Sequence, residues 1–566
     1  MPAYIVKSTG TRTTGESTIT GNDLVDFADS NCYALIKTCL AQSNANGNVI
    51  TLDDEAHVVT TIPAGADWKY SQTMSSRSGN PELCSVTTAN TTGHLFDMAL
   101  GGAPGGDWVF NNIQLTRSTT QTDASSLLYT AGTILQDISF NGCILGDFTL
   151  DNAIAGSQLN GCILSTLSHT RTVAFDECTF RNISASWTNA GYGALLRISG
   201  NADCTMTNCS WDNIQRNITL NDVTGAVYID NTGSTTTITD SSFTDITMSG
   251  NDTAMSMKPF INSSAVNAQN LSGLTLTRVV KQQAQYTSGI FSFIKGAFDI
   301  RDITAIDCSN LGTSIDYIGD GGVFYQDGVS AVGKFRNINA YGCKARSGVA
   351  IFSSNGANLE CENITADNCQ ADIGIIYSGY DGDAVINGAL ITNTTPFTPT
   401  QSRHGLGIFA RINPAAATDK TVEINNVTLL NNVNDATYVD GIEIINDHAT
   451  AVMTNVINNV ICRNGGETGL EIRSNGTGTI TTTMNNCNVE GGATSTSGTI
   501  NNNLTSVDPL LDANGVPTAN SPMVGAGSRW WTGANPVGAN GEPFSDFDTD
   551  IGAIQSTHGK FHPVNL

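Results

Sequence analysis

The feature that most constrains the fold of this chain is an internal repeat built on glycine. A Gly followed by a short apolar stretch recurs along the middle of the sequence, at Gly193, Gly225, Gly289, Gly322, Gly348, Gly374, Gly407, Gly441 and Gly469. Successive copies lie 26 to 34 residues apart, apart from one interval of 64 residues that spans two units. A period in this range is typical of solenoids, propellers and other repeat folds.

A second pattern follows the glycine stretches and keeps the same order in each unit. It consists of an apolar or aromatic residue, any residue, Asn or Asp, and then Ile or Val. The copies are at residues 180–183, 211–214, 243–246, 300–303, 335–338, 361–364, 424–427 and 453–456. Two ordered patterns indicate a structural repeat rather than a bias of composition alone.

The character of each unit favours an all-β fold. The apolar stretches are short and β-branched, Asn and Gly fill the turns, and segments with a period of 3.6 residues are almost absent. A propeller blade needs four strands and about 40 residues, so it fits less well. The repeat therefore predicts a parallel β-solenoid, with about three strands in each coil and apolar side chains stacked from coil to coil.

The two ends of the repeat predict caps, because the open ends of a solenoid are strand edges that need cover. Residues 22–42 carry an amphipathic helix pattern, and Trp530 and Trp531 begin a Gly- and Pro-rich tail. We therefore expect an N-terminal strand and helical cap at residues 1–60. The solenoid is expected at 61–505 and a C-terminal cap or tail at 506–566.

The cysteines follow the repeat. Cys143, Cys308, Cys343 and Cys369 each lie five residues after an Ile, and the chain has 14 Cys with no Cys-x-x-Cys pair. Cys is a small apolar residue that suits a tight interior corner, so stacked, reduced and inert thiols are favoured over disulfides. His558 and His562 lack a third ligand, so no metal or other cofactor is expected.

Composition excludes several function classes. The 51 acidic and 26 basic residues give a formal charge of -25, which repels nucleic acid and anionic membranes. No run of 18 apolar residues occurs, which argues against a membrane-spanning helix. The first ten residues have neither a basic nor an apolar region, so they do not read as a signal peptide.

At this level the chain resembles a known family. The pairing of a Gly-Ala-Ile-like strand with a Phe-x-Asn-like strand resembles the repeats of polymorphic outer-membrane proteins and related right-handed parallel β-helix proteins. Residues 521–527 and 550–554 are similar to the tail of many pectate-lyase-like helices. The resemblance implies a right-handed, single-stranded parallel β-helix.

Without an export signal or anchor, the chain looks most like a bacteriophage tailspike or tail fibre protein. Residues 64–84 are similar to the opening of phage-encoded β-helix proteins. The resemblance implies a location in the phage tail, release from the host by lysis, and other virion tail proteins as partners. It also implies that residues 1–60 serve as a virion attachment segment.

The glycine strands also predict an oligomer. If the residues one and three positions after each Gly face inward, those two and four positions after it face outward. The outward set is then Leu195, Val227, Phe291, Phe293, Phe324, Phe352, Ile376 and Phe409. An exposed apolar stripe usually marks an interface, so a homotrimer packed on this stripe is favoured over a loop of the same chain that covers it.

Carboxylates and tyrosines concentrate between residues 316 and 383, which suggests carbohydrate chemistry. Asp327, Asp381 and Asp383 are candidate catalytic residues, because a glycosidase needs two carboxyl groups about 5 to 9 Å apart. Aromatic rings stack on sugars, so Tyr317, Tyr377 and Tyr380 are candidate substrate-binding residues. The alternative is that these are ordinary solvated turns.

A second candidate group is basic. Arg403 and Arg411 can bind the carboxylate of an acidic sugar, and His404 can act as the base of a lyase. A loop with salt bridges is the alternative explanation.

Taken together, the sequence predicts a phage receptor-binding or tailspike protein that recognises a host cell-surface polysaccharide through many weak contacts. Two alternatives stay open. One is a lyase or glycosidase that degrades the polysaccharide. The other is a non-catalytic protein, either a structural fibre, a capsid decoration protein or a bacterial adhesin. Whether the chain is an enzyme is left open.

Overall fold

The computed structural model divides the chain into two compact units, Met1–Gln285 (unit 1) and Tyr286–Leu566 (unit 2). The structure describes residues 3–6, 48–52, 54, 56–59, 72–88, 94–97, 107–117, 126–130, 136–152, 161–166, 170–187, 194–199, 202–218, 227–230, 235–250, 261–263 and 269–282 of unit 1. In unit 2 it describes residues 289–293, 296–311, 322–327, 331–346, 349–380, 382–397, 406–415, 418–432, 439, 441–463, 469–490, 493–495, 499–505, 507–512, 516–524, 526–527 and 550–552.

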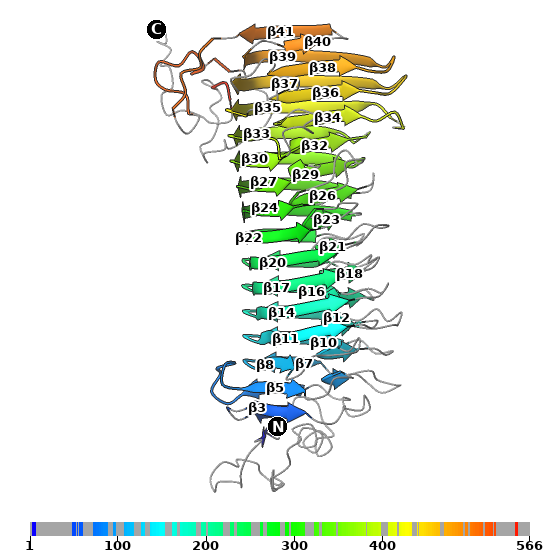
Figure 1. The fold of residues 1–566 in the computed structure, drawn as a ribbon, viewed down its shortest axis with the longest axis vertical. Coiled ribbons are helices and arrows are strands. Elements are labelled where there is room, and N and C mark those ends of the chain that lie inside the picture. The colour runs from blue at the N-terminus through cyan, green and yellow to red at the C-terminus, as the bar shows by residue number, and fades with distance from the viewer. Residues whose placement is uncertain are drawn as a thin grey trace, which may run out of the picture. The chain divides into compact units, whose positions relative to one another are not determined.

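Unit 1 is a parallel β-solenoid whose strands form two sheets, named sheet A and sheet B (Figure 1). Sheet A contains β1 (Ala3–Val6), β2 (Asn48–Leu52), β3 (Ala56–Val59), β4 (Gln72–Ser76), β5 (Ser85–Thr88), β7 (Trp108–Asn111), β8 (Gln114–Arg117), β10 (Gln136–Asn141), β11 (Ile144–Asn152), β13 (Thr170–Asp176), β14 (Thr179–Trp187), β16 (Asp203–Thr207), β17 (Ser210–Ile218), β19 (Thr236–Thr239), β20 (Ser242–Gly250) and β22 (Gln269–Gln282). Sheet B contains β6 (Phe96–Asp97), β9 (Leu128–Thr130), β12 (Gly161–Thr166), β15 (Ala194–Ser199), β18 (Val227–Asp230) and β21 (Ile261–Ser263).

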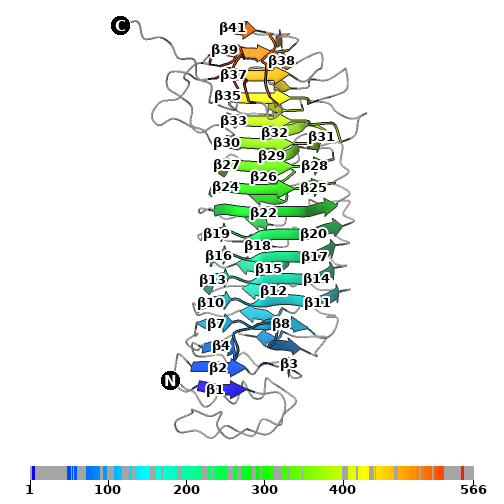
Figure 2. The same ribbon diagram turned by 90° about the vertical axis from the view of Figure 1, so that its left-hand side faces the viewer.

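Unit 2 is built in the same way, and Figure 2 shows its strands stacked coil upon coil. Its sheet A contains β24 (Gly296–Ile306), β25 (Ser309–Asn310), β27 (Ala331–Tyr341), β28 (Lys344–Ala345), β30 (Asn358–Asp367), β31 (Gln370–Ala371), β33 (Ala384–Thr392), β35 (Lys420–Leu430), β37 (Val452–Arg463), β39 (Thr479–Val489) and β41 (Thr499–Thr505). Its sheet B contains β23 (Phe291–Phe293), β26 (Phe324–Asp327), β29 (Val349–Asn355), β32 (Gly374–Gly379), β34 (Ile408–Ile412), β36 (Ile442–Asn446), β38 (Leu470–Ser474) and β40 (Ala493–Ser495).

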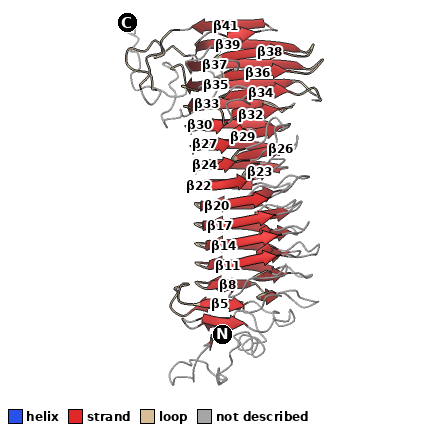
Figure 3. Cartoon of the chain, in the orientation of Figure 1, coloured by secondary structure: helices blue, strands red, loops and turns tan. Residues whose placement is uncertain are grey.

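The predicted fold class is confirmed in both units. Strands one coil apart pair in parallel and in register, as where Ile376 of β32 pairs with Ile408 of β34. The described residues contain strands and connecting turns but no helix (Figure 3). The predicted helical cap at residues 22–42 lies outside the described residues. The right-handed winding, the domain boundaries and the C-terminal cap stay predictions.

The corners of the coils explain the Asn and Asp of the second sequence pattern. The described coils turn through residues with φ between +50° and +73°, a left-handed conformation that Asn, Asp and Gly adopt most readily. In unit 1 these residues are Asn112, Gly142, Glu177, Asn208, Asp240 and Gly273, and the last five of them are followed five positions later by Asp147, Asn182, Asn213, Asp245 and Arg278. In unit 2 they are Asp302, Asn337, Asn363, Gly388, Asn426, Asn459 and Asn486, with Asp307, Gly342, Asn368, Asn393 and Asn431 at the second corner.

One predicted copy of this pattern is wrong. Residues 453–456 were expected to match 424–427, but β35 pairs Ile424 with Ile457 and Val427 with Val460. The pattern occurs twice in a row in residues 453–460, and the left-handed corner lies in the second copy, at Asn459. The sequence pattern alone does not distinguish the two.

The thiols occupy the predicted interior corners. Six cysteines, Cys143, Cys178, Cys209, Cys308, Cys343 and Cys369, each follow a left-handed corner directly. The Cys143 and Cys178 thiols donate to the carbonyl oxygens of Phe110 and Phe140 in the preceding coil, both at 3.3 Å. Among the described residues eleven cysteines are buried and belong to no disulfide, as expected for reduced thiols in that part of the chain.

The core of unit 1 is a column of aromatic rings. Phe110, Phe140 and Phe175 stack with centroids 5.0 and 5.1 Å apart, and Phe180 lies 3.9 Å from Trp211. Each ring comes from a different strand of sheet A and is buried. In-register stacking of like side chains thus joins one coil to the next.

The predicted outward stripe is wrong for the core of unit 2. Phe291, Phe324, Phe352 and Ile376 form one register column of sheet B. The rings of Phe324 and Phe352 lie 5.3 and 4.7 Å from Phe335 of sheet A, so this column points into the space between the sheets.

The remaining members of the stripe do not form an exposed surface either. Leu195, Val227 and Phe409 have exposed fractions of 0% within the chain. The Phe293 side chain lies outside the described residues. The distance from the glycine to the strand differs between coils, and a bulge shifts the register between Val349 and Phe352, so a fixed count from each glycine does not identify one face. The homotrimer itself stays a prediction, without this stripe to support it.

The described part of the C-terminal segment packs against the side of unit 2. Met523 and Ile551 form a cluster with Ile461 of β37. The backbone N–H of Gly552 donates to the carbonyl of Asn459 at 2.9 Å. The two stretches that resemble the tail of pectate-lyase-like helices therefore meet on one strand.

Candidate functional site

The outer face of sheet B in unit 2 carries the largest group of functional side chains that the described residues bring together. Successive side chains of a strand point to opposite faces of its sheet. The register column that contains Ile376 faces the core, so the next column faces outward. That outward column consists of Tyr377, Phe409, Glu443 and Glu471, one residue from each of β32, β34, β36 and β38.

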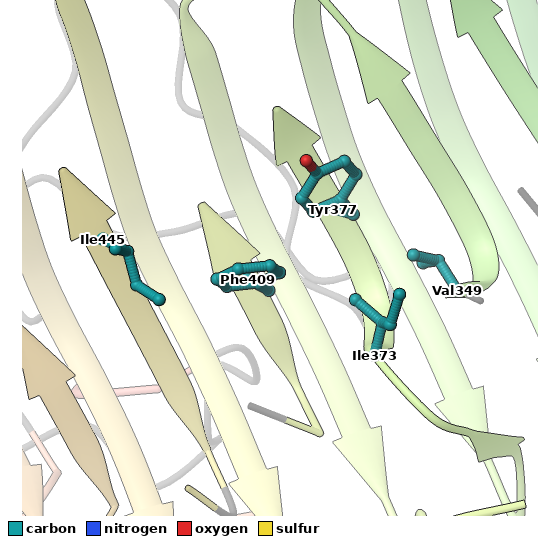
Figure 4. Packing of buried hydrophobic residues seen from close by; sticks show 5 residues of the cluster. All are labelled: Val349, Ile373, Tyr377, Phe409 and Ile445. Atoms are coloured by element: carbon teal, nitrogen blue, oxygen red, sulfur yellow. The ribbon is translucent and has the colours of Figure 1, made fainter. Parts of the chain in front are cut away.

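The first half of this column is apolar and buried. The rings of Tyr377 and Phe409 lie 5.3 Å apart and cluster with Val349, Ile373 and Ile445 (Figure 4). All five side chains have exposed fractions of 5% or less within the chain. This part of the face therefore supports the neighbouring polar groups and is not itself open to a ligand.

Polar side chains lie beside this cluster. The Nε of Arg411 donates to Oδ2 of Asp447 at 2.5 Å, and Nδ2 of Asn475 donates to Oδ1 of the same carboxylate at 2.7 Å. Burial raises the pKa of Tyr377, and the nearby Arg411 cation opposes the rise while Tyr380 and Asp447 add to it. Tyr377 is therefore a neutral hydroxyl within electrostatic reach of the other three groups.

Backbone conformation positions the two tyrosines. Gly379 follows Tyr377 by two residues, and a Cβ at Gly379 would overlap the Tyr377 hydroxyl. Tyr380 has φ of +57°, a left-handed conformation that costs a bulky residue about 1 to 3 kcal/mol. Strain of this kind is concentrated at functional sites, which draws attention to Tyr380.

The second half of the column is charged. Nη2 of Arg473 lies 2.7 Å from Oε1 of Glu443, and Nη1 lies 4.0 Å from Oε1 of Glu471. The Glu443 side chain is 2% exposed, whereas Arg473 and Glu471 are 31% and 23% exposed. One guanidinium therefore lies beside two carboxylates from neighbouring coils and leaves part of its donor edge open to solvent.

This arrangement suits recognition of hydroxyl groups. Arg and carboxylate groups are planar and present pairs of donors or acceptors in fixed directions. We name Arg411, Asp447, Asn475, Glu443, Arg473 and Glu471 the polar strip of unit 2. Each cation in the polar strip already lies near a carboxylate, so the strip does not present the unpaired positive charge that a lyase for acidic sugars requires.

The structure brings together three of the predicted substrate-binding residues, namely Tyr377, Tyr380 and Arg411. Tyr317, Arg403, His404 and Asp381 lie outside the described residues. Asp327 ends β26, but its side chain is outside the described part. The roles proposed for these residues stay predictions.

Asp383 joins two coils of sheet A. Its backbone N–H donates to Oδ1 of Asn358 at 3.0 Å, and its own Oδ1 accepts from the N–H of Thr421 at 2.7 Å. The carboxylate is exposed and belongs to a different sheet from the polar strip. Its predicted catalytic role is untested, and these contacts give it a structural role.

Sequence reasoning missed Asp447, Glu443, Arg473 and Asn475 as site residues. A signal was present for one of them. Glu443 lies two residues after Gly441, at a position where the earlier repeats carry apolar residues. A charge at such a position departs from the repeat, and such departures are expected at functional sites.

Two further findings concern the described residues. They contain no group of three or more His, Cys, Asp or Glu side chains placed to hold a metal ion. Within the same part of the chain, no helix is long and apolar enough to span a membrane.

Comparisons with known proteins give little beyond the fold. No model of a known protein family matches the chain, and no curated protein matches it. Among solved structures it is similar to the catalytic unit of a thermostable GH87 α-1,3-glucanase from Streptomyces thermodiastaticus strain HF3-3. That likeness has 11% identity and a TM-score of 0.28, and covers 84% of this chain and 68% of the glucanase chain. It carries no argument about activity.

Proposed function

We propose that this chain recognises a polysaccharide and that the sugar binds along the polar strip of unit 2. The observation that carries the proposal is the Glu443–Arg473–Glu471 group beside the Arg411–Asp447 pair on one sheet face. Planar donors and acceptors that are already fixed by ion pairs lose little conformational entropy when they bind sugar hydroxyls.

The solenoid supports the same proposal. Neighbouring coils lie about 4.8 Å apart, so equivalent side chains recur at regular intervals along the face. A polymer that follows the coils contacts several such positions at once, and weak contacts then add up through multivalency. The formal charge of -25 favours a neutral polymer over a polyanion.

The more specific role is that of a phage tailspike or tail fibre protein, trimeric and located in the virion tail. The sequence resemblance supports it. Mass spectrometry of purified particles tests this role: we expect the chain to be a virion component, and its absence from particles would remove the tailspike role while leaving polysaccharide recognition open.

A binding experiment tests the recognition itself. We expect the full chain to be retained by polysaccharide purified from the surface of its host cells. Arg473→Gln removes the charge and the Nη donors but leaves a neutral polar side chain, so we expect retention to fall at least about tenfold, which corresponds to about 1.4 kcal/mol. Lys334→Gln changes an exposed ion pair on sheet A and serves as the matched control.

The outcomes separate the proposal from misfolding. Circular dichroism and the melting temperature show whether each variant keeps the solenoid. Equal retention of the folded Arg473→Gln variant and the native chain would contradict the assignment of the polar strip. Failure of the native chain to bind any host polysaccharide would contradict the function, and would favour a structural protein.

A second candidate function is hydrolysis of the polysaccharide. Glu443 and Glu471 are register partners on neighbouring coils, and carboxyl groups about 5 Å apart suit a retaining glycosidase. In that case Glu471→Gln would abolish the release of new reducing ends but leave binding in place. If the native chain releases no reducing ends from a polysaccharide that it binds, this candidate is excluded.

A further inference from the structure

The first corners of unit 2 carry a column of side-chain amides with a defined direction. Nδ2 of Asn337 donates to Oδ1 of Asp302 at 2.8 Å, and Nδ2 of Asn363 donates to Oδ1 of Asn337 at 3.1 Å. Further along, Nδ2 of Asn459 donates to Oδ1 of Asn426 at 2.9 Å. Each amide thus donates to the preceding coil and offers its oxygen to the next.

This column is interrupted at one coil. The corner between those of Asn363 and Asn426 is Gly388, which adopts the same left-handed conformation with φ of +73° but has no side chain. The register confirms the order, because Ile364 pairs with Ala389 and Ala389 pairs with Val427. One amide is therefore missing between two that are present.

Each of the two amides that face the gap has one atom without a hydrogen-bond partner. Oδ1 of Asn363 has no donor and Nδ2 of Asn426 has no acceptor, although both atoms are buried. Asn426 as a residue has an exposed fraction of 0%. A buried polar atom without a partner costs about 1 to 3 kcal/mol, so two on either side of one gap require an explanation.

The space beside Gly388 borders the side chain of Asn363. The three atoms nearest to a Cβ built on Gly388 all belong to Asn363, and the closest, Oδ1, is 3.1 Å away. The adjacent residue, Asn387, does not fill the gap, because its Oδ1 accepts from Asn425 in a separate column. Asn387 therefore does not supply the missing amide.

We propose that buried water fills the space beside Gly388 and completes the column. Water donates a proton to Oδ1 of Asn363, and water accepts one from Nδ2 of Asn426. The site suits water because it offers one acceptor and one donor on either side of the place where an amide would otherwise lie. It lies on sheet A, apart from the polar strip, and does not depend on the proposed function.

A high-resolution crystal structure of the full chain tests the proposal directly. We expect water density within about 3.2 Å of Asn363 Oδ1 and within about 3.2 Å of Asn426 Nδ2. Gly388→Asn places an amide at this position in a conformation that Asn accepts, so the water density should be replaced by the new side chain. An empty site, or two amides that bond directly to other protein atoms, would overturn the proposal.

Melting temperatures provide a second readout. We expect Gly388→Asn to raise the melting temperature by about 2 °C, because the amide replaces a bound water. Gly388→Ala adds a Cβ at positive φ without an amide and should lower it. Gly79→Asn, at a left-handed turn glycine with φ of +75°, measures the general effect of the substitution. If Gly388→Asn raises the melting temperature no more than Gly79→Asn does, the gap beside Gly388 is not a polar site.

Discussion

At the scale of single residues, backbone conformation decides where Asn and Asp occur. Every copy of the second sequence pattern that the structure confirms has its Asn or Asp at a left-handed corner. Side chains at these corners also form hydrogen bonds between neighbouring coils. For example, Nδ2 of Asn213 donates to Oδ1 of Asn182 at 2.8 Å. The pattern thus combines a conformational requirement with a hydrogen-bonded column.

Asn337 separates these two contributions. Asn337→Gly keeps the left-handed conformation but removes the bond to Asp302, which costs about 1 kcal/mol. Asn337→Ala removes the bond and also adds about 1 to 2 kcal/mol of backbone strain. We therefore expect the melting temperature to fall in both variants and to fall further for Ala. Equal losses in the two variants would show that the corner conformation does not constrain this position.

The buried thiols predict a loss of stability at alkaline pH. Burial raises the pKa of Cys204 to about 12 and that of Cys487 to about 11, against 9.0 for an exposed thiol. A raised pKa in the folded state means that the stabilisation is complete below pH 9 and is lost as the pH rises towards 12. We expect the melting temperature to decrease over this range.

Cys204→Ala is the control for this pH dependence. It removes one titrating group, so the slope of melting temperature against pH should become shallower between pH 9 and pH 12. The absolute melting temperature also changes because the core is altered, so the slope is the quantity to compare. An unchanged slope would mean that the Cys204 thiol is not protected from ionisation.

At the scale of elements, the glycine repeat marks the start of the sheet B strands. One residue separates Gly289 from β23 and Gly322 from β26. Gly407 and Gly441 come directly before β34 and β36. The neighbouring coil approaches these glycines closely, since a Cβ on Gly441 would overlap the carbonyl oxygen of Gly469 and the thiol of Cys462. Steric exclusion therefore fixes glycine at this position.

Gly441→Ala tests this close approach. The carbonyl of Gly469 is backbone and cannot move alone, so we expect a loss of stability larger than about 2 kcal/mol, seen as a large drop in melting temperature or in soluble yield. Gly407→Ala is the matched control, because its Cβ would lie 2.8 Å from the Gly441 oxygen and 3.0 Å from the side chain of Leu429. A milder effect at Gly441 than at Gly407 would contradict the packing.

The same elements show how far sequence could predict the structure. The glycines and the Asn corners are required by the backbone of each coil, so the fold class and most strand positions could be predicted from them. The face of the sheet to which each side chain points could not be predicted in this way. The number of residues between the glycine and the strand differs from coil to coil: Phe324, two residues after Gly322, faces the core with Phe352, whereas Phe409, two residues after Gly407, lies in the outward column.

The candidate site was predictable only in part, for a similar reason. Tyr377, Tyr380 and Arg411 were identified by residue type, but Asp447 and Glu443 reach the same face only through the stacking of β34, β36 and β38. Their positions depend on a register that sequence spacing does not supply, because the coils of unit 2 differ in length. Departure from the repeat at Glu443 was the one available signal.

At the scale of the whole molecule, the net charge limits the ligands that the chain attracts, and the stacking of coils accounts for its stability. A chain with a formal charge of -25 repels polyanions, and its stability comes from many equivalent contacts between coils rather than from one central core. Within each unit the register of neighbouring coils therefore determines both the core and the functional surface.

Cross-linking across one pair of coils in unit 2 tests that register most directly. Lys334 and Glu360 are register partners on β27 and β30, with Nζ and Oε1 3.0 Å apart, whereas Glu362 lies two residues further along the strand. Adjacent in-register Cα atoms are within the 4.4 to 6.8 Å range, roughly, that a disulfide spans, and the diagonal pair is beyond it. We predict that Lys334→Cys with Glu360→Cys forms a disulfide under mild oxidation, mapped by mass spectrometry, and that Lys334→Cys with Glu362→Cys does not. Preferential cross-linking of the second pair would contradict the stacked coils on which the whole account depends.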